Sequence, residues 1–233
     1  MYAPWDLTSS SNQTNIVSIK GIPFKKLKLL GEGYQSVVYE AKKFTSEFRC
    51  AVKIVSFKHP DPREQKDLFK TFLKEVDLLI KLNNQSLHIA RIYDYDIDHF
   101  EMYGKIVMEL GTKDFRSLLP LRIPATAKII GEPQRKYYWK QMIEAIRVIH
   151  LNGITHSDVK PENFIFVRNI LKIIDFGTPD YMPPEVCRPS RNSAMMKFGY
   201  KADIWSLGCI LYEMSFGQRP FEHIHGDIEK MSM

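Results

Sequence analysis

Cysteine is scarce in this sequence, with three residues in 233, and none of them stands in a C-x-x-C pair. Zinc sites and disulfide frameworks need closely spaced or numerous cysteines, so neither is expected. We expect the protein to reside in a reducing compartment. No run approaches the roughly 18 uncharged apolar residues of a membrane helix. The first fifteen residues contain neither a basic start nor an apolar core, so the sequence predicts no secretory signal peptide.

An excess of charge is also lacking, since 33 basic and 27 acidic residues leave a net charge of +6. Basic residues gather in two groups, at 20–28 and at 188–201. Solvated surface explains such groups, and the alternative is a preference for acidic substrate segments. No motif supports nucleic-acid binding. The 44% hydrophobic and 26% charged content is typical of a globular protein of one domain or two small ones.

The first half of the chain has the pattern of a small β-rich lobe. Residues 1–15 are polar and unpatterned, which predicts a disordered tail. Residues 24–57 contain three β-type runs separated by tight turns, and two similar runs follow later. Between them a helix is expected, with Asp61 as its cap and Glu64 completing a capping box. We assign this lobe to residues 16–110. The apolar face of the helix is predicted to consist of Leu68, Phe72, Val76, Leu79 and Ile80.

Residues 111–233 have a helical pattern instead. The run 132–150 has one apolar side, and Gly153 stands where a helix-terminating glycine belongs. A second helix, DIWSLGCILYEMSFG, is apolar nearly all round, so we expect it to be buried in the middle of its lobe. The fold class is therefore α+β, with a β-rich lobe followed by a mostly helical one.

The chemistry is concentrated in the stretch HSDVKPENFIFVRNILKIIDFG. Asp158 is a carboxylate that can accept a hydroxyl proton, and Lys160 is a cation two residues away. Asn163 and Asp175 supply oxygen ligands that suit a hard divalent cation such as Mg²⁺. This combination suits phosphoryl transfer, in which the protein mainly positions groups and neutralises charge.

The same stretch resembles the protein-kinase catalytic loop, H-R-D-x-x-x-x-N, followed by D-F-G and A-P-E. Ser157 stands where the pattern has arginine, and Pro183 where it has alanine. The resemblance implies a two-lobed kinase fold and transfer of the γ-phosphoryl group of ATP-Mg²⁺ to a protein hydroxyl. The enzyme would be a serine/threonine kinase or one of dual specificity.

Residues of the first lobe fit the nucleotide-binding half of that pattern. The hairpin with Gly31, Gly33 and Ser36 is either an ordinary turn or a loop whose backbone approaches phosphates. Lys53 lies in the strand CAVKIV, where kinases have the lysine that contacts the α- and β-phosphates. We expect it to pair with Glu75, because an ammonium among apolar residues is costly to bury alone. The alternative is an ordinary surface pair.

Four segments together resemble the TTK family, the monopolar-spindle checkpoint kinases: H-S-D-x-K-P-x-N-F, Y-M-P-P-E, R-I-Y-D-Y-D-I and Y-Y-W-K-Q-M. The resemblance runs from about residue 16 to about 229. It implies kinetochore and checkpoint proteins as substrates, a nuclear, kinetochore or cytoplasmic location, and no membrane or nucleic-acid partner. It also implies a nucleotide pocket in which Val38 and Ala51 pack on adenine, Glu109 and Gly111 form the hinge, and Met108 is the gatekeeper. The alternative interpretation of Met108 is an ordinary residue of the hydrophobic core.

Two departures from the family argue against full activity. Only seven residues separate Gly177 from Glu185, so the long activation segment and its phosphorylation sites are absent. The sequence also stops soon after PFEHIHGDIEKMSM, which predicts an incomplete second lobe, an unpaired Glu185 and an exposed apolar surface on the helix of Trp205. Three alternatives follow: an impaired kinase, a nucleotide-binding pseudokinase-like module, or an inactive product of splicing or a faulty gene model.

Overall fold

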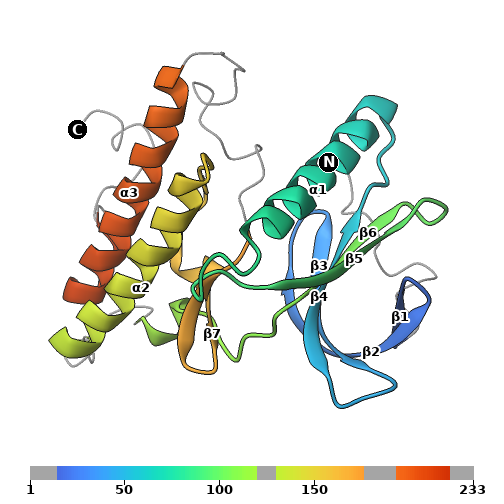
Figure 1. Ribbon diagram of the computed structural model, residues 1–233, viewed down its shortest axis with the longest axis horizontal. Coiled ribbons are helices and arrows are strands. Elements are labelled where there is room, and N and C mark those ends of the chain that lie inside the picture. The colour runs from blue at the N-terminus through green and yellow to red at the C-terminus, as the bar shows by residue number, and fades with distance from the viewer. Residues whose placement is uncertain (1–14, 120–129, 176–192, 221–233) are drawn as a thin grey trace. The chain divides into compact units, whose positions relative to one another are not determined.

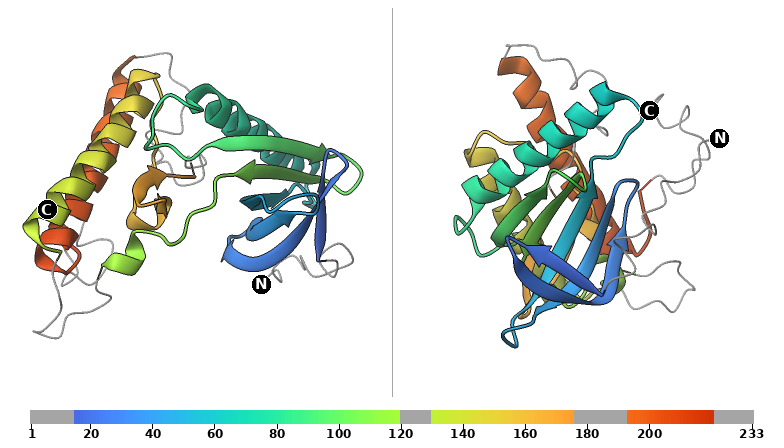
Figure 2. Two further views of the ribbon diagram at one scale, coloured as in Figure 1. Left: turned by 60° about the horizontal axis from the view of Figure 1, so that its bottom comes forward. Right: turned by 90° about the vertical axis from the view of Figure 1, so that its right-hand side faces the viewer.

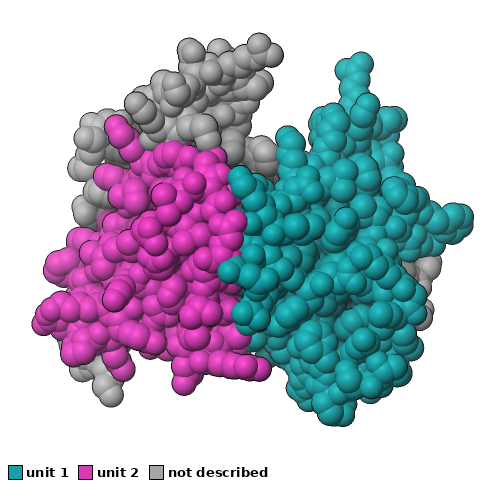
Figure 3. Space-filling view, in the orientation of Figure 1, with its two compact units in different colours: residues 1–84, 90–111 teal, residues 85–89, 112–233 magenta. Residues whose placement is uncertain are grey.

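The computed structural model describes residues 15–119, 130–175 and 193–220, with side chains from residue 199 onward in the last range. It divides into two compact units, residues 1–84 with 90–111 and residues 85–89 with 112–233 (Figure 3). Each unit is described by itself.

Unit 1 is built on a six-stranded antiparallel sheet with the strand order β1-β2-β3-β4-β6-β5 (Figures 1 and 2). The sequence predicted five of these strands and missed β1. Its four residues pair with β2 through a two-residue turn, Lys20-Gly21, in which both φ angles are positive, at 49° and 79°. Such turns match the twist of the strands they join. The strands are β1 (Ile16–Ile19), β2 (Ile22–Glu32), β3 (Ser36–Lys43), β4 (Arg49–Ser56), β5 (Ile92–Asp98) and β6 (Tyr103–Met108).

The missed strand completes a hydrophobic core on one face of the sheet. Val17 and Ile19 of β1 pack in one cluster with Cys50 and Val52 of β4. Phe24, Ala41 and Val107 complete this cluster. Burial raises the pKa of the Cys50 thiol to about 11, so it behaves as a small apolar side chain.

The other face of the sheet carries the long helix α1 (Pro62–Leu82). As predicted, Asp61 caps it, accepting a hydrogen bond of 2.8 Å from the Arg63 amide. The capping box is not formed as expected, because the Asp61 amide donates to His59 Nδ1 at 3.2 Å. The predicted apolar face is correct except at Ile80, which is 49% exposed. The buried residues of α1 are Phe72, Glu75, Val76, Leu79 and Leu82.

Unit 2 contains the helices α2 (Glu132–Leu151) and α3 (Ser193–Phe216), which lie side by side (Figure 1). Gly153 follows α2 with φ of 73°, as expected of a helix-terminating glycine. A hairpin of β7 (Phe164–Val167) and β8 (Ile170–Ile173) packs on α2 through β8. Two short 3₁₀ helices, η1 (Arg116–Leu118) and η2 (Pro161–Asn163), complete the described elements.

The prediction that the apolar helix α3 is buried all round is wrong. Leu207, Ile210 and Met214 are buried, whereas Trp205 is 65% exposed and Phe216 57% exposed. The predicted exposed apolar surface on this helix is therefore present, and among the described elements α2 is its main neighbour. None of the described helices has the length and apolarity needed to cross a membrane.

Candidate active site

The pairing predicted between strand and helix in unit 1 is present. Lys53 Nζ on β4 lies 2.7 Å from Glu75 Oε1 on α1. The two side chains are only 11% and 7% exposed, so the surface-pair alternative is wrong. A carboxylate at hydrogen-bond distance offsets the cost of burying this ammonium and fixes its position beside the sheet.

The glycine hairpin between β2 and β3 is tight. The Gly33 amide donates to the Ser36 carbonyl at 2.7 Å, and a Cβ at residue 33 would lie 3.2 Å from Ser36 Oγ. Around Gly31 there is open space, because no atom lies within 4 Å of the position of a Cβ. A phosphate could therefore approach this backbone closely, although a plain turn has the same geometry.

The residues predicted to contact adenine share one face of the sheet. Val38 is paired with Lys53, and Ala51 with Met108. Directly paired residues, and alternate residues of one strand, project to the same side. This side is the one that carries the Lys53 ammonium. At the end of β6 the Glu109 amide donates to the Arg91 carbonyl at 2.9 Å, and Gly111 is the last residue of unit 1.

In unit 2 the structure brings three predicted residues together in the loop before β7. Lys160 Nζ lies 2.6 Å from Asp158 Oδ2, and Asn163 Nδ2 donates to the Asp158 carbonyl at 2.8 Å and to Asp158 Oδ2 at 3.1 Å. Burial acts to lower the pKa of Lys160, but the hydrogen bond to Asp158 and the charges of the nearby carboxylates together outweigh it, so the pKa is raised. Because the Asn163 amide nitrogen faces Asp158, its oxygen is directed elsewhere and can act as a ligand.

Asp175 follows a residue that is tied to the same loop. The Ile174 amide donates to the Asn163 carbonyl at 2.8 Å, and its own carbonyl accepts from His156 Nε2 at 3.2 Å. Asp175 is exposed and has φ of 57°, an uncommon backbone conformation for a residue with a side chain. Phe176, Gly177, Pro183 and Glu185, with the predictions made for them, lie outside the described residues.

A buried carboxylate that the sequence analysis did not single out supports this loop. Asp203 Oδ2 accepts the His156 amide at 2.9 Å, and Asp203 Oδ1 accepts the Ser157 amide at 2.8 Å. Its side chain is 1% exposed, and His150 Nε2 lies 2.7 Å from Oδ2. Ser157 has φ of 64°, so these hydrogen bonds stabilise a strained residue directly before Asp158. An acid at the start of an apolar stretch of helix was the available signal.

The buried His156 ring is neutral, with one nitrogen that donates a hydrogen bond and one that accepts a hydrogen bond. Its Nε2 donates to the Ile174 carbonyl, and its Nδ1 accepts the Asp158 amide at 3.3 Å. Burial lowers the pKa of His156, which agrees with a neutral ring in this position.

No cluster of three or more His, Cys, Asp or Glu residues that could hold a metal occurs in the part of the chain that the structure describes. A divalent cation with few protein ligands fits this site only if substrate phosphates complete its coordination, as is usual for Mg²⁺. The pair of donors Asn163 and Asp175, beside Asp158, is of that kind.

Comparison with known proteins identifies the family of this chain, because residues 24–233 match the protein kinase domain family. The chain belongs to the protein kinase family. By family it is a protein serine/threonine kinase, with the α+β fold of a β-rich sheet unit and a helical unit.

The individual relatives include kinases named TTK, MPS1 and mph1. Mouse "Dual specificity protein kinase TTK" is 35% identical over 249 residues, covering 97% of this chain and 28% of the mouse protein. Budding yeast (Saccharomyces cerevisiae) "Serine/threonine-protein kinase MPS1" is 33% identical over 253 residues, covering 96% and 31%. Fission yeast (Schizosaccharomyces pombe) "Serine/threonine-protein kinase mph1" is 32% identical over 238 residues, covering 91% and 34%.

The lengths of these matches are informative. This kinase domain spans about a third or less of the relatives it matches. The match to the mouse kinase extends over 249 residues although the chain has only 233. The mouse protein therefore contains residues in the matched region that have no counterpart in this chain.

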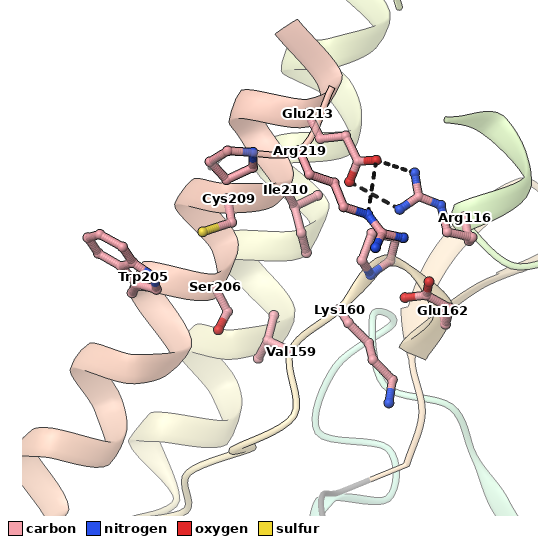
Figure 4. A pocket seen from close by; sticks show the side chains of 12 residues that line it. Arg116, Val159, Lys160, Glu162, Trp205, Ser206, Cys209, Ile210, Glu213 and Arg219 are labelled. Atoms are coloured by element: carbon pink, nitrogen blue, oxygen red, sulfur yellow. Dashed lines mark hydrogen bonds and ion pairs between the residues drawn. The ribbon is translucent and has the colours of Figure 1, made fainter. Parts of the chain in front are cut away.

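A pocket of about 700 Å³ lies within unit 2, beside the loop that follows Asp158 (Figure 4). Its wall contains a buried ion pair in which Arg116 donates to both carboxylate oxygens of Glu213. Arg219 approaches the same carboxylate at 4.0 Å. The sequence analysis missed this pocket, because its residues come from three separate segments. The other lining residues come from the loop, α3 and the segment after it: Val159, Lys160, Pro161, Glu162, Trp205, Ser206, Cys209, Ile210 and Pro220.

Proposed function

We propose that this chain is an ATP- and Mg²⁺-dependent protein kinase domain of the spindle-checkpoint type whose transfer to protein substrates is reduced. The observation that supports it best is the loop in which Lys160 and Asn163 both contact Asp158 Oδ2, at 2.6 and 3.1 Å. A carboxylate that is held by a cation and an amide can orient a substrate hydroxyl and accept the proton of that hydroxyl.

Each residue of this loop has one task in the proposal. Asp158 orients the substrate hydroxyl and accepts its proton, and Lys160 neutralises charge on the transferring group. The oxygens of Asn163 and Asp175 hold the metal. ATP-Mg²⁺, when bound, supplies the phosphoryl group and the divalent charge that bridges its phosphates.

Unit 1 supplies the nucleotide-binding residues. Lys53, fixed by Glu75, contacts phosphates, and the open backbone at Gly31 approaches them. Val38, Ala51 and Met108 form the apolar face for adenine, next to the hinge residues Glu109 and Gly111. The prediction that Asp158, Asn163 and Asp175 converge on the Gly31–Ser36 hairpin concerns both units and stays a prediction.

In this proposal the short link after Gly177 weakens the binding of the protein substrate. The eight Cα–Cα steps from Gly177 to Glu185 reach at most about 26–29 Å, so the link has no slack for a substrate platform. The longer matched region of the mouse kinase agrees with a deletion in this chain. We therefore infer nucleotide binding with transfer at least about tenfold reduced, or about 1.4 kcal/mol in the barrier.

By similarity to the checkpoint kinases, we propose kinetochore or checkpoint proteins as substrates and a nuclear, kinetochore or cytoplasmic location. The second candidate is a nucleotide-binding module without transfer, which the short link favours. A γ-phosphoryl transfer assay beside a nucleotide thermal-shift assay separates the two. Asp175→Ala should abolish the Mg²⁺-dependent part of the thermal shift with the fold intact, and an unchanged shift would refute the metal assignment.

A further inference from the structure

Gly104 of β6 occupies the most crowded position recorded for a glycine in the described chain. A Cβ at this residue would lie 2.5 Å from Phe72 Cε2 and 2.6 Å from Phe57 Cζ. Both rings are 1% exposed, and they meet edge-on with centroids 5.3 Å apart. Two aromatic rings therefore fill the space that a side chain on this strand would occupy.

This crowded position lies on the face of the sheet that carries Lys53. Gly104 is paired with Val55, and the neighbouring pair on the same side is Lys53 with Ile106. On α1, Phe72 and Glu75 are three residues apart, so they project from one side of the helix. Phe72 docks at Gly104 while Glu75 reaches Lys53 at 2.7 Å. The two contacts share one helix face and one sheet face.

We propose that Gly104 is a positioning residue for phosphoryl transfer. Its missing side chain lets Phe57 and Phe72 dock against β6, and this contact sets the depth at which α1 places Glu75 against Lys53. The inference rests on the proposed function, in which the paired Lys53 contacts nucleotide phosphates.

The rings have little freedom to yield. The Phe57 amide is bound to the Met102 carbonyl at 2.8 Å, and its ring also meets Phe69 edge-on at 5.3 Å. A contact of 2.5 Å must lengthen by about 1 Å to reach ordinary van der Waals distance. If α1 moves out by that amount, the ion pair lengthens to a distance at which no hydrogen bond remains.

The direction in which Gly104→Ala changes the stability distinguishes a crowded glycine from an ordinary glycine in a strand. A glycine inside a strand weakens it, so replacement by alanine in open space stabilises the protein. In the crowded space at Gly104, alanine should destabilise it and loosen the ion pair. Gly208 of α3 provides a matched control, because no atom lies within 4 Å of a Cβ there.

The experiment measures the coupling between Lys53 and Glu75 by a double-mutant cycle on urea unfolding, using Lys53→Met, Glu75→Gln and the double variant. We expect the coupling to fall by at least half when Gly104→Ala is added and to stay unchanged with Gly208→Ala. Adding Phe72→Leu to Gly104→Ala removes the colliding ring atoms and should return the coupling to the value measured with Phe72→Leu alone. An unchanged coupling in Gly104→Ala overturns the inference.

Two further outcomes keep the test decisive. If Gly104→Ala alone does not fold, the double variant with Phe72→Leu should fold, and its failure to fold would also overturn the inference. Because unfolding does not require phosphoryl transfer, a parent chain that shows the expected coupling pattern but transfers no phosphate contradicts the proposed function, whereas the positioning of Glu75 against Lys53 by Gly104 is still supported. With an active parent, Gly104→Ala should lower kcat at least tenfold, and it should have no further effect in the Glu75→Gln background.

Discussion

The buried ion pair of unit 1 gives the sharpest prediction of stability. Glu75→Gln removes the carboxylate that lies 2.7 Å from the Lys53 ammonium, which is 11% exposed. Breaking such a pair by removing one partner costs about 3–5 kcal/mol, because the remaining charge stays buried. A domain is stabilised by only about 5–15 kcal/mol in total, so this loss is a large fraction of it.

An exposed Lys–Glu pair elsewhere in the chain serves as a control for the effect of burial. Lys136 and Glu132 also form a Lys–Glu ion pair, at 2.6 Å, but their side chains are 75% and 63% exposed. Urea unfolding at pH 7 should show a large loss for Glu75→Gln and no measurable change for Glu132→Gln. Equal effects of the two substitutions would refute the argument that burial makes the Lys53 pair important.

Two further predictions concern unit 2. Burial lowers the pKa of His156, so the unfolded chain binds a proton at this residue more readily than the folded chain does. The contribution of His156 to the free energy of unfolding should therefore be complete above about pH 6.5 and fall as the pH drops below it. The same pH dependence of the unfolding free energy in the parent and in His156→Gln, between about pH 7 and 5, would contradict this. Arg116→Ala should cost about 3–5 kcal/mol, because Glu213 stays buried after losing both hydrogen bonds from Arg116 and keeps only Arg219 at 4.0 Å. The joint replacement Arg116→Met with Glu213→Leu should recover most of this loss. An Arg116→Ala variant as stable as the parent in urea would refute the assignment.

The sequence predicted those parts of the fold that have a periodic pattern. The strands between residues 24 and 57 are β-type runs bounded by tight turns, and α1 has an apolar stripe preceded by a capping aspartate, so the Lys53–Glu75 pair could be inferred from both. β1 was missed because four residues carry too little pattern to recognise. Its role became visible only when Val17 and Ile19 were found in the core of the sheet.

What the sequence could not predict depends on contacts between distant residues. The crowding at Gly104 comes from Phe57 and Phe72, which no local pattern relates to it. An exposed apolar surface on α3 was predicted, but not which face of the helix is covered, since an apolar stretch indicates burial without saying which face packs against a neighbour. The roles of the catalytic-loop residues came from a motif, and their mutual contacts came from the structure.

The central claim is that Asp158 orients and deprotonates the substrate hydroxyl in a chain that retains nucleotide binding. The most direct measurement is single-turnover transfer of the γ-phosphoryl group from ATP-Mg²⁺ to a generic protein acceptor, for the parent chain and Asp158→Asn. The account predicts slow but measurable transfer by the parent, a further loss of about 10²–10⁴-fold in the variant, and the same nucleotide thermal shift in both. Equal transfer rates for the parent and Asp158→Asn would contradict it.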